Sequence, residues 1–107
     1  SLVESLGYQV QIADGTDTAL ALFDTARNGE LEPHLVLTDL TMPGRDGIEL
    51  AGALRERKFA GPIALITGFG DESARRAAEA GVTKILQKPI SREDLGIAIR
   101  KLLDQSD

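Results

Sequence analysis

Residues 35–44 read LVLTDLTMPG, one carboxylate between a short apolar run and a turn rich in proline and glycine. Residues 35–37 are apolar without alternation, which is typical of a strand buried on both faces of a parallel sheet. Because an ionised aspartate is rarely buried without a partner, we expect Asp39 at the carboxyl end of this strand, on the rim of the sheet. Ligands bind at that rim in open α/β sheets. From this stretch alone, Asp39 could equally be a turn cap, a common place for aspartate.

Length and composition indicate one globular domain and exclude several classes of site. The chain has 107 residues, a net charge of −5, one histidine and no cysteine. The acidic excess argues against a nucleic-acid or anionic-membrane surface, because both attract clustered positive charge. Without cysteine, disulfides and thiol catalysis are excluded, and a single histidine makes a histidine-based zinc site implausible. With no signal peptide and no apolar run near the roughly 20 residues of a membrane span, the chain is compatible with a cytoplasmic protein.

Apolar spacing and turn residues predict helices and strands in alternation. Helices are expected at residues 1–6, 17–28, 47–58 and 72–80 and from residue 91 onward, and strands at residues 8–13, 35–38, 63–67 and 82–87. Such alternation with short connections implies right-handed crossovers and a mostly parallel sheet with helices on both faces. We therefore predict a doubly wound α/β fold in one domain, residues 1–107.

Several polar residues are expected to have local roles. Asp46 and Asp94 should lie at helix beginnings, where carboxylates interact favourably with the helix dipole. Ser91 opens a variant of the capping box. Arg75 and Arg76 are interpreted as a solvated face, with contact to a partner as the alternative.

Three of the loops that follow strands begin with polar residues of different chemistry, namely Asp39, Thr67 and Lys88. The intervals, 67 − 39 = 28 and 88 − 67 = 21 residues, each fit about one helix and one strand, so adjacent places on the rim are expected. A carboxylate can attack phosphorus and become an acyl phosphate. An ammonium and a hydroxyl can hold the phosphoryl oxygens, and Gly68 leaves room for the phosphoryl group beside the backbone.

These residues belong to three motifs that resemble the receiver domain of two-component response regulators. The motifs are LVLTDLTMPGRDG at 35–47, ALITG at 64–68 and AGVTKILQKP at 80–89. The likeness covers essentially the whole chain, with the motifs in the family's order and spacing. It implies a flavodoxin-like parallel sheet of strand order 2-1-3-4-5.

The resemblance also implies roles for site residues. Asp39 is the expected phosphoacceptor, Thr67 the switch hydroxyl beside Gly68, and Lys88 the partner of the phosphorylated aspartate, with a cis Lys88-Pro89 bond.

The implied cofactor is a magnesium ion held by Asp39 and the backbone carbonyl of Thr41. The implied donor is a histidine kinase or a histidine phosphotransfer protein, and the face around the last two helices is expected to meet a partner or a second copy. Such a domain is a cytoplasmic signalling module rather than a turnover enzyme, although receivers assist their own phosphorylation and dephosphorylation.

The chain departs from the family pattern in two places. The family begins with a strand ending in an acidic pair that holds magnesium, followed by most of the first helix, and neither precedes Ser1. We expect these elements in a longer parent protein. The family carries Tyr or Phe at the position of Ile85, so the switch is expected to run through Thr67 and the loop after it. Thr41 and Phe69 stand at positions expected to tune the phosphoryl lifetime.

Two alternatives remain at this point. One is a pseudo-receiver, a protein-interaction module that takes no phosphoryl group. The other is a small phosphatase with an aspartate nucleophile, whose usual signature has a second aspartate where this chain has Thr41.

Overall fold

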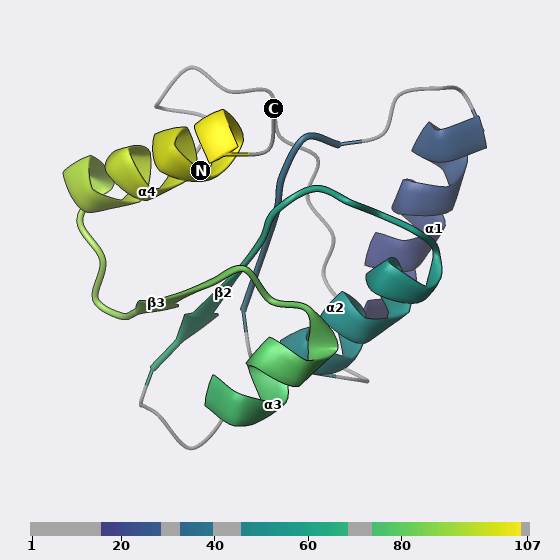
Figure 1. The fold of residues 1–107 in the computed structure, drawn as a ribbon, viewed down its shortest axis with the longest axis horizontal. Helices are drawn as coiled ribbons and strands as arrows, with labels where there is room; N and C mark the ends of the chain where they lie inside the picture. Colours follow the sequence, from purple (N-terminus) through teal and green to yellow (C-terminus); the bar gives the residue numbers. More distant parts are fainter. Residues whose placement is uncertain (1–15, 29–32, 40–45, 69–73, 106–107) are drawn as a thin grey trace.

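The computed structural model describes residues 16–28, 33–39, 46–68 and 74–105. The helix and strand predicted within residues 1–13 lie outside these ranges. Four helices and three strands alternate along the described chain (Figure 1): α1 Thr16–Asn28, β1 Val36–Asp39, α2 Gly47–Glu56, β2 Ile63–Thr67, α3 Ala74–Ala80, β3 Lys84–Gln87 and α4 Arg92–Gln105.

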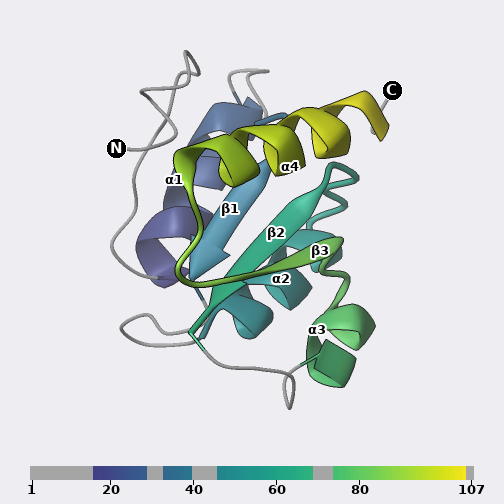
Figure 2. The ribbon, with the colours of Figure 1, turned by 90° about the vertical axis from the view of Figure 1, so that its left-hand side faces the viewer.

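The described strands form one parallel sheet in the order β1-β2-β3. Helix α4 covers one face of this sheet, and α1, α2 and α3 lie on the other side (Figure 2). A parallel sheet between two helix layers is the doubly wound α/β architecture predicted from the alternation of elements.

The core is divided by the central strand, whose side chains alternate between the two faces. Ile63 packs with Leu20, Phe23 and Leu54 of α1 and α2. Its neighbour Ala64 packs beneath α4, against Leu95, Ile99 and Leu102. A third cluster joins α2, β2 and α3 through Ile48, Leu65 and Ala77. Burial of β2 from both sides explains its unbroken apolar sequence.

Helix α2 has a well-defined beginning. Asp46 is the N-cap, and its Oδ1 accepts a hydrogen bond from the Glu49 amide at 2.8 Å. The Glu49 side chain in turn accepts from the Asp46 amide at 3.3 Å, which completes a capping box. The prediction of Asp46 as a helix-start residue is confirmed, and so is the Ser91 cap of α4, whose hydroxyl accepts from the Asp94 amide at 3.0 Å.

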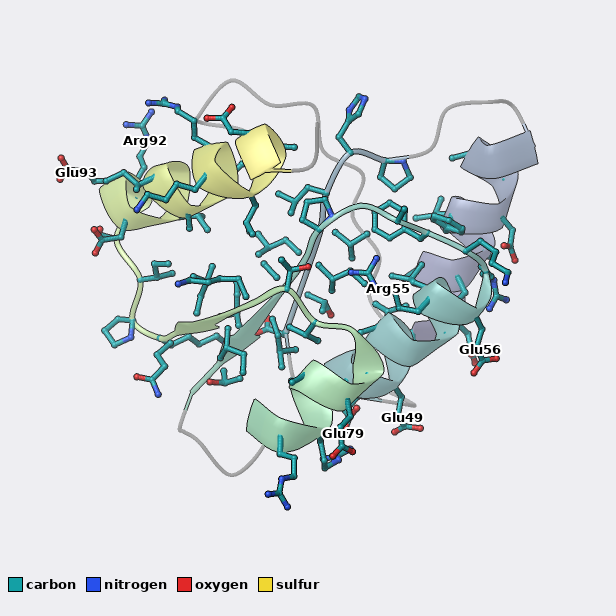
Figure 3. The ribbon with its side chains drawn as sticks, viewed as in Figure 1. Glu49, Arg55, Glu56, Glu79, Arg92 and Glu93 are labelled. Carbon is teal, nitrogen blue, oxygen red and sulfur yellow. The ribbon has the colours of Figure 1, made fainter. Side chains whose placement is uncertain are left out.

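The Arg55 guanidinium joins two turns at the opposite end of the sheet from Asp39. Its Nη1 donates to the carbonyls of Phe59 and Gly61, both at 2.7 Å. Its Nε and Nη2 donate to the Gly81 carbonyl at 3.1 and 2.8 Å, and Nη2 also donates to Thr83 Oγ1 at 3.4 Å. All five N–H donors of the side chain are thus used. In Figure 3, Arg55 points inward, whereas Glu56 of the same helix points away from the sheet. Burial lowers the pKa of Arg55.

Two strands differ from their predictions. Residues 35–37 were expected to be buried on both faces but are half-buried, because β1 is the last strand of the described sheet on its side. Strand β3 begins at Lys84 instead of residue 82. The Val82 amide donates to the Ala77 carbonyl at 2.9 Å, so this residue closes the end of α3 before the strand starts.

Candidate functional site

The carboxyl ends of the described strands meet at one edge of the sheet. Asp39 is the last residue of β1 and pairs with Ile66, and Thr67 ends β2 opposite Gln87 of β3. The Lys88 amide extends this pairing by donating to the Thr67 carbonyl at 2.8 Å. The structure therefore gathers the three predicted polar positions on one rim.

Asp39 and Lys88 are in direct contact across the central strand. Lys88 Nζ lies 2.8 Å from Asp39 Oδ1, with 53% and 46% of the two side chains exposed. An ion pair this accessible stabilises the fold by about 1 kcal/mol at most, so its main effect is to place an ammonium beside the carboxylate. The Lys88-Pro89 bond is cis, as predicted.

Thr67 is the buried member of the site. Its side chain is 1% exposed, and within the described residues its Oγ1 has no hydrogen-bond partner. A buried hydroxyl without a partner is unfavourable by about 1–3 kcal/mol. Gly68 follows, and a Cβ built at that glycine meets no atom within 4 Å. The residue after this buried hydroxyl is thus exposed and uncrowded.

The first turn of α2 packs closely against the backbone of Asp39. A Cβ built at Gly47 would lie 2.2 Å from the Asp39 carbonyl oxygen and 2.8 Å from Leu65 Cδ1. Only glycine allows this approach. Glycine is usually found in turns or just after the end of a helix, not in the first turn of a helix. A glycine at position 47 was therefore a signal in the sequence for this close contact.

The other predicted site residues are the tuning positions Thr41, Phe69 and Ile85. Thr41 and Phe69 lie outside the described residues. Ile85 is half-buried and packs on the cluster of Ile48, Leu65 and Ala77, so an aliphatic side chain occupies this interior position.

The site fits a magnesium ion only in part. An exposed carboxylate such as Asp39 is a suitable hard oxygen ligand, and magnesium is often held by one or two carboxylates together with phosphate and water. In the portion of the chain that the structure covers, no group of three or more acidic, histidine or cysteine side chains is arranged to hold a metal. Asp39 can supply one ligand, and further acidic ligands would come from outside the described residues.

Comparison with known proteins places this chain in a family. A family model described as the response regulator receiver domain matches residues 1–100. The chain belongs to the response regulator receiver domain family. It is also 35% identical over 102 residues to the transcriptional regulatory protein ResD of Bacillus subtilis. That match covers 94% of the receiver domain but 40% of ResD.

Solved receiver domains share the fold. A response regulator receiver domain from Clostridium thermocellum superposes with a TM-score of 0.85 at 28% identity, covering 97% of this chain and 81% of the other. The BeF3-activated receiver domain of RstA from Klebsiella pneumoniae gives a TM-score of 0.80 at 25% identity, covering 94% and 82%. These similarities confirm the predicted fold class and the predicted family. Among the helices that the structure describes, none has the length and apolar character of a membrane span.

Proposed function

We propose that Asp39 is the phosphoacceptor of this receiver domain, and that Thr67 and Lys88 bind the transferred phosphoryl group. The observation that carries the proposal is the buried, unpartnered Thr67 hydroxyl on the same rim as the Asp39–Lys88 ion pair. A polar group left without a partner in the resting protein is explained if a ligand satisfies it in another state.

The chemistry follows from the geometry. An Asp39 oxygen attacks the phosphorus of a phosphohistidine whose other ring nitrogen is protonated. The new O–P bond forms as the P–N bond breaks, and the ring leaves as neutral imidazole. Lys88 then balances charge on the phosphoryl oxygens, and the Thr67 hydroxyl donates a hydrogen bond to one of them. Hydrolysis of the acyl phosphate by water regenerates Asp39.

Magnesium would be held by Asp39 and by the backbone carbonyl of Thr41, together with acidic ligands from outside the described residues. When bound, this ion neutralises charge on the phosphoryl group. Lys88 contributes to the same neutralisation from the described part of the site.

The phosphoryl group switches the domain by favouring one arrangement of the segment after Thr67. A ligand shifts such an equilibrium only by its difference in affinity for the two arrangements. The hydrogen bond from Thr67 supplies that difference. Because Ile85 replaces the family's aromatic side chain, the readout runs through Thr67 and the chain that follows it, and Phe69 tunes the lifetime of the acyl phosphate.

The donor is a cytoplasmic histidine kinase or histidine phosphotransfer protein, and the face formed by α3, β3 and α4 binds the partner or a second copy. The net charge of −5 favours protein partners over nucleic acid.

The test is phosphorylation of the full-length natural protein with magnesium and a small phosphodonor, read by intact mass. We expect a gain of one phosphoryl group in the wild type and none in Asp39→Asn, which keeps the shape of the side chain. Asp24→Asn on helix α1, whose carboxylate pairs with Arg57 rather than Lys88, is the matched control and should be phosphorylated. Absence of the gain in the wild type, or its persistence in Asp39→Asn, would contradict the proposal and favour an interaction module that takes no phosphoryl group.

A further inference from the structure

Asp46 has two separate contacts at the start of α2. One carboxylate oxygen, Oδ1, caps the helix through the Glu49 amide at 2.8 Å. The other, Oδ2, accepts from Nη2 of Arg76 on α3 at 3.2 Å. The residue that fixes the beginning of one helix therefore also binds the next helix along the chain.

The neighbouring residue connects this helix beginning to the acceptor strand. Gly47 lies directly against the Asp39 carbonyl, so the first turn of α2 and the end of β1 cannot move independently. This contact is between backbone atoms, which transmit a displacement better than a long flexible side chain does.

An apolar contact joins the same two helices beneath the ion pair. Ile48 of α2 packs with Ala77 of α3 and Leu65 of β2, and all three side chains are buried. Ile48 and Ala77 directly follow Gly47 and Arg76 in sequence. Asp46, Gly47 and Ile48 thus form a continuous set of contacts between Asp39 and α3, in which Asp46 makes the polar contact.

We propose that Asp46 is a positioning residue that, through Arg76, holds α3 in the arrangement described here. This rests on the proposed function, in which occupation of Asp39 changes the arrangement of the chain after Thr67. Breaking the ion pair removes an interaction that favours the resting arrangement, so a ligand at Asp39 should bind more tightly.

The substitutions can separate the two contacts of Asp46. Asp46→Asn keeps a capping oxygen, since asparagine and aspartate are equally good N-caps, but loses the charge that faces Arg76. Arg76→Gln removes the same pair from α3 and leaves the cap untouched. Arg75→Gln, one residue away on the exposed side of α3, is the control for loss of a positive charge.

The readout is an equilibrium titration with beryllium fluoride and magnesium, using the full-length protein. Beryllium fluoride bound to a carboxylate imitates an acyl phosphate, and the RstA relative is activated in this way. Ala78→Cys on the exposed side of α3 can carry a fluorophore that reports on α3, and residues 1–107 contain no other cysteine.

We expect Asp46→Asn and Arg76→Gln each to lower the apparent Kd by about 1.5- to 5-fold, the range of an exposed ion pair. The double variant should match the single ones, because both changes remove the same interaction, and Arg75→Gln should match the wild type. A residue that only stabilised the fold would change the urea midpoint without this non-additive change in Kd.

Unchanged Kd values in both single variants, or effects that add in the double variant, would overturn the role of Asp46 while leaving the acceptor function intact. If the wild type neither binds beryllium fluoride nor becomes phosphorylated, the acceptor function itself is wrong and this proposal falls with it.

Discussion

Two glycines in helix α2 should respond in opposite ways to the same substitution. At Gly47, an added Cβ would lie 2.2 Å from the Asp39 carbonyl oxygen, whereas ordinary contacts begin at 3.4 Å, so a displacement of 3.4 − 2.2 = 1.2 Å is required. The obstructing atom belongs to the backbone of strand β1 and cannot rotate away. At Gly52, an added Cβ meets no atom within 4 Å.

The expected energies follow from these surroundings. Forcing a methyl group into a packed contact destabilises a protein by roughly 1–3 kcal/mol, so Gly47→Ala should lower the free energy of unfolding by about 2 kcal/mol. Gly52→Ala should raise it by about 0.5–1 kcal/mol, because alanine favours the helix. The chain has no tryptophan, so urea unfolding is best followed by far-ultraviolet circular dichroism.

The same displacement should slow phosphorylation, because a misplacement of about 1 Å in a reacting group can reduce a rate by about 100-fold. We expect Gly47→Ala to accept the phosphoryl group 10- to 100-fold more slowly, by the same reasoning, and Gly52→Ala to react at the wild-type rate. If Gly47→Ala is as stable and as reactive as Gly52→Ala, the contact between α2 and Asp39 does not position the acceptor.

Two further substitutions test the other unusual groups. Thr67→Val should raise the free energy of unfolding by about 1 kcal/mol, because the buried hydroxyl has no described partner. It should also weaken retention of the phosphoryl group. A loss of stability would show that the hydroxyl has a hydrogen-bond partner in the unphosphorylated protein. Arg55→Lys should destabilise by about 2 kcal/mol, because an ammonium has three donors and cannot reproduce the planar fork. Arg100→Lys, at an exposed position of α4, is its control, and equal urea midpoints for these two variants would contradict the role of the network.

The sequence predicts elements best where the cause is local. The apolar run of β2 is bounded by Gly61-Pro62 and by Gly68, and its predicted limits, residues 63–67, match the structure. The start of β3 depends on the Val82 amide, which donates to the Ala77 carbonyl of α3. No residue spacing within the strand reveals this contact. Burial of residues 35–37 depends on which strands lie beside β1, and this is also a property of the assembled sheet.

The candidate site shows the same difference between features with a local cause and features that depend on the assembled fold. Placement of Asp39, Thr67 and Lys88 on one rim was predictable, because parallel strands align their carboxyl ends. The unpartnered state of the Thr67 hydroxyl was not, because it depends on every atom around it. Asp46 was correctly predicted as a helix-start residue, but its partner Arg76 is 30 residues away, and local spacing says nothing about so distant a pair.

The Arg55 hydrogen-bond network affects how the domain responds to acid and which residues of its two turns can change. Its acceptors are backbone carbonyls and one hydroxyl, none of which titrates, and arginine remains protonated. These hydrogen bonds between the two turns should therefore persist in acid. Because carbonyls are common to all residues, the hydrogen bonds alone do not dictate the side chains of these turns. The close packing does so at two positions, because an added Cβ would lie 2.6 Å from the Phe59 ring at Gly61 and 2.7 Å from Arg55 Cγ at Gly81.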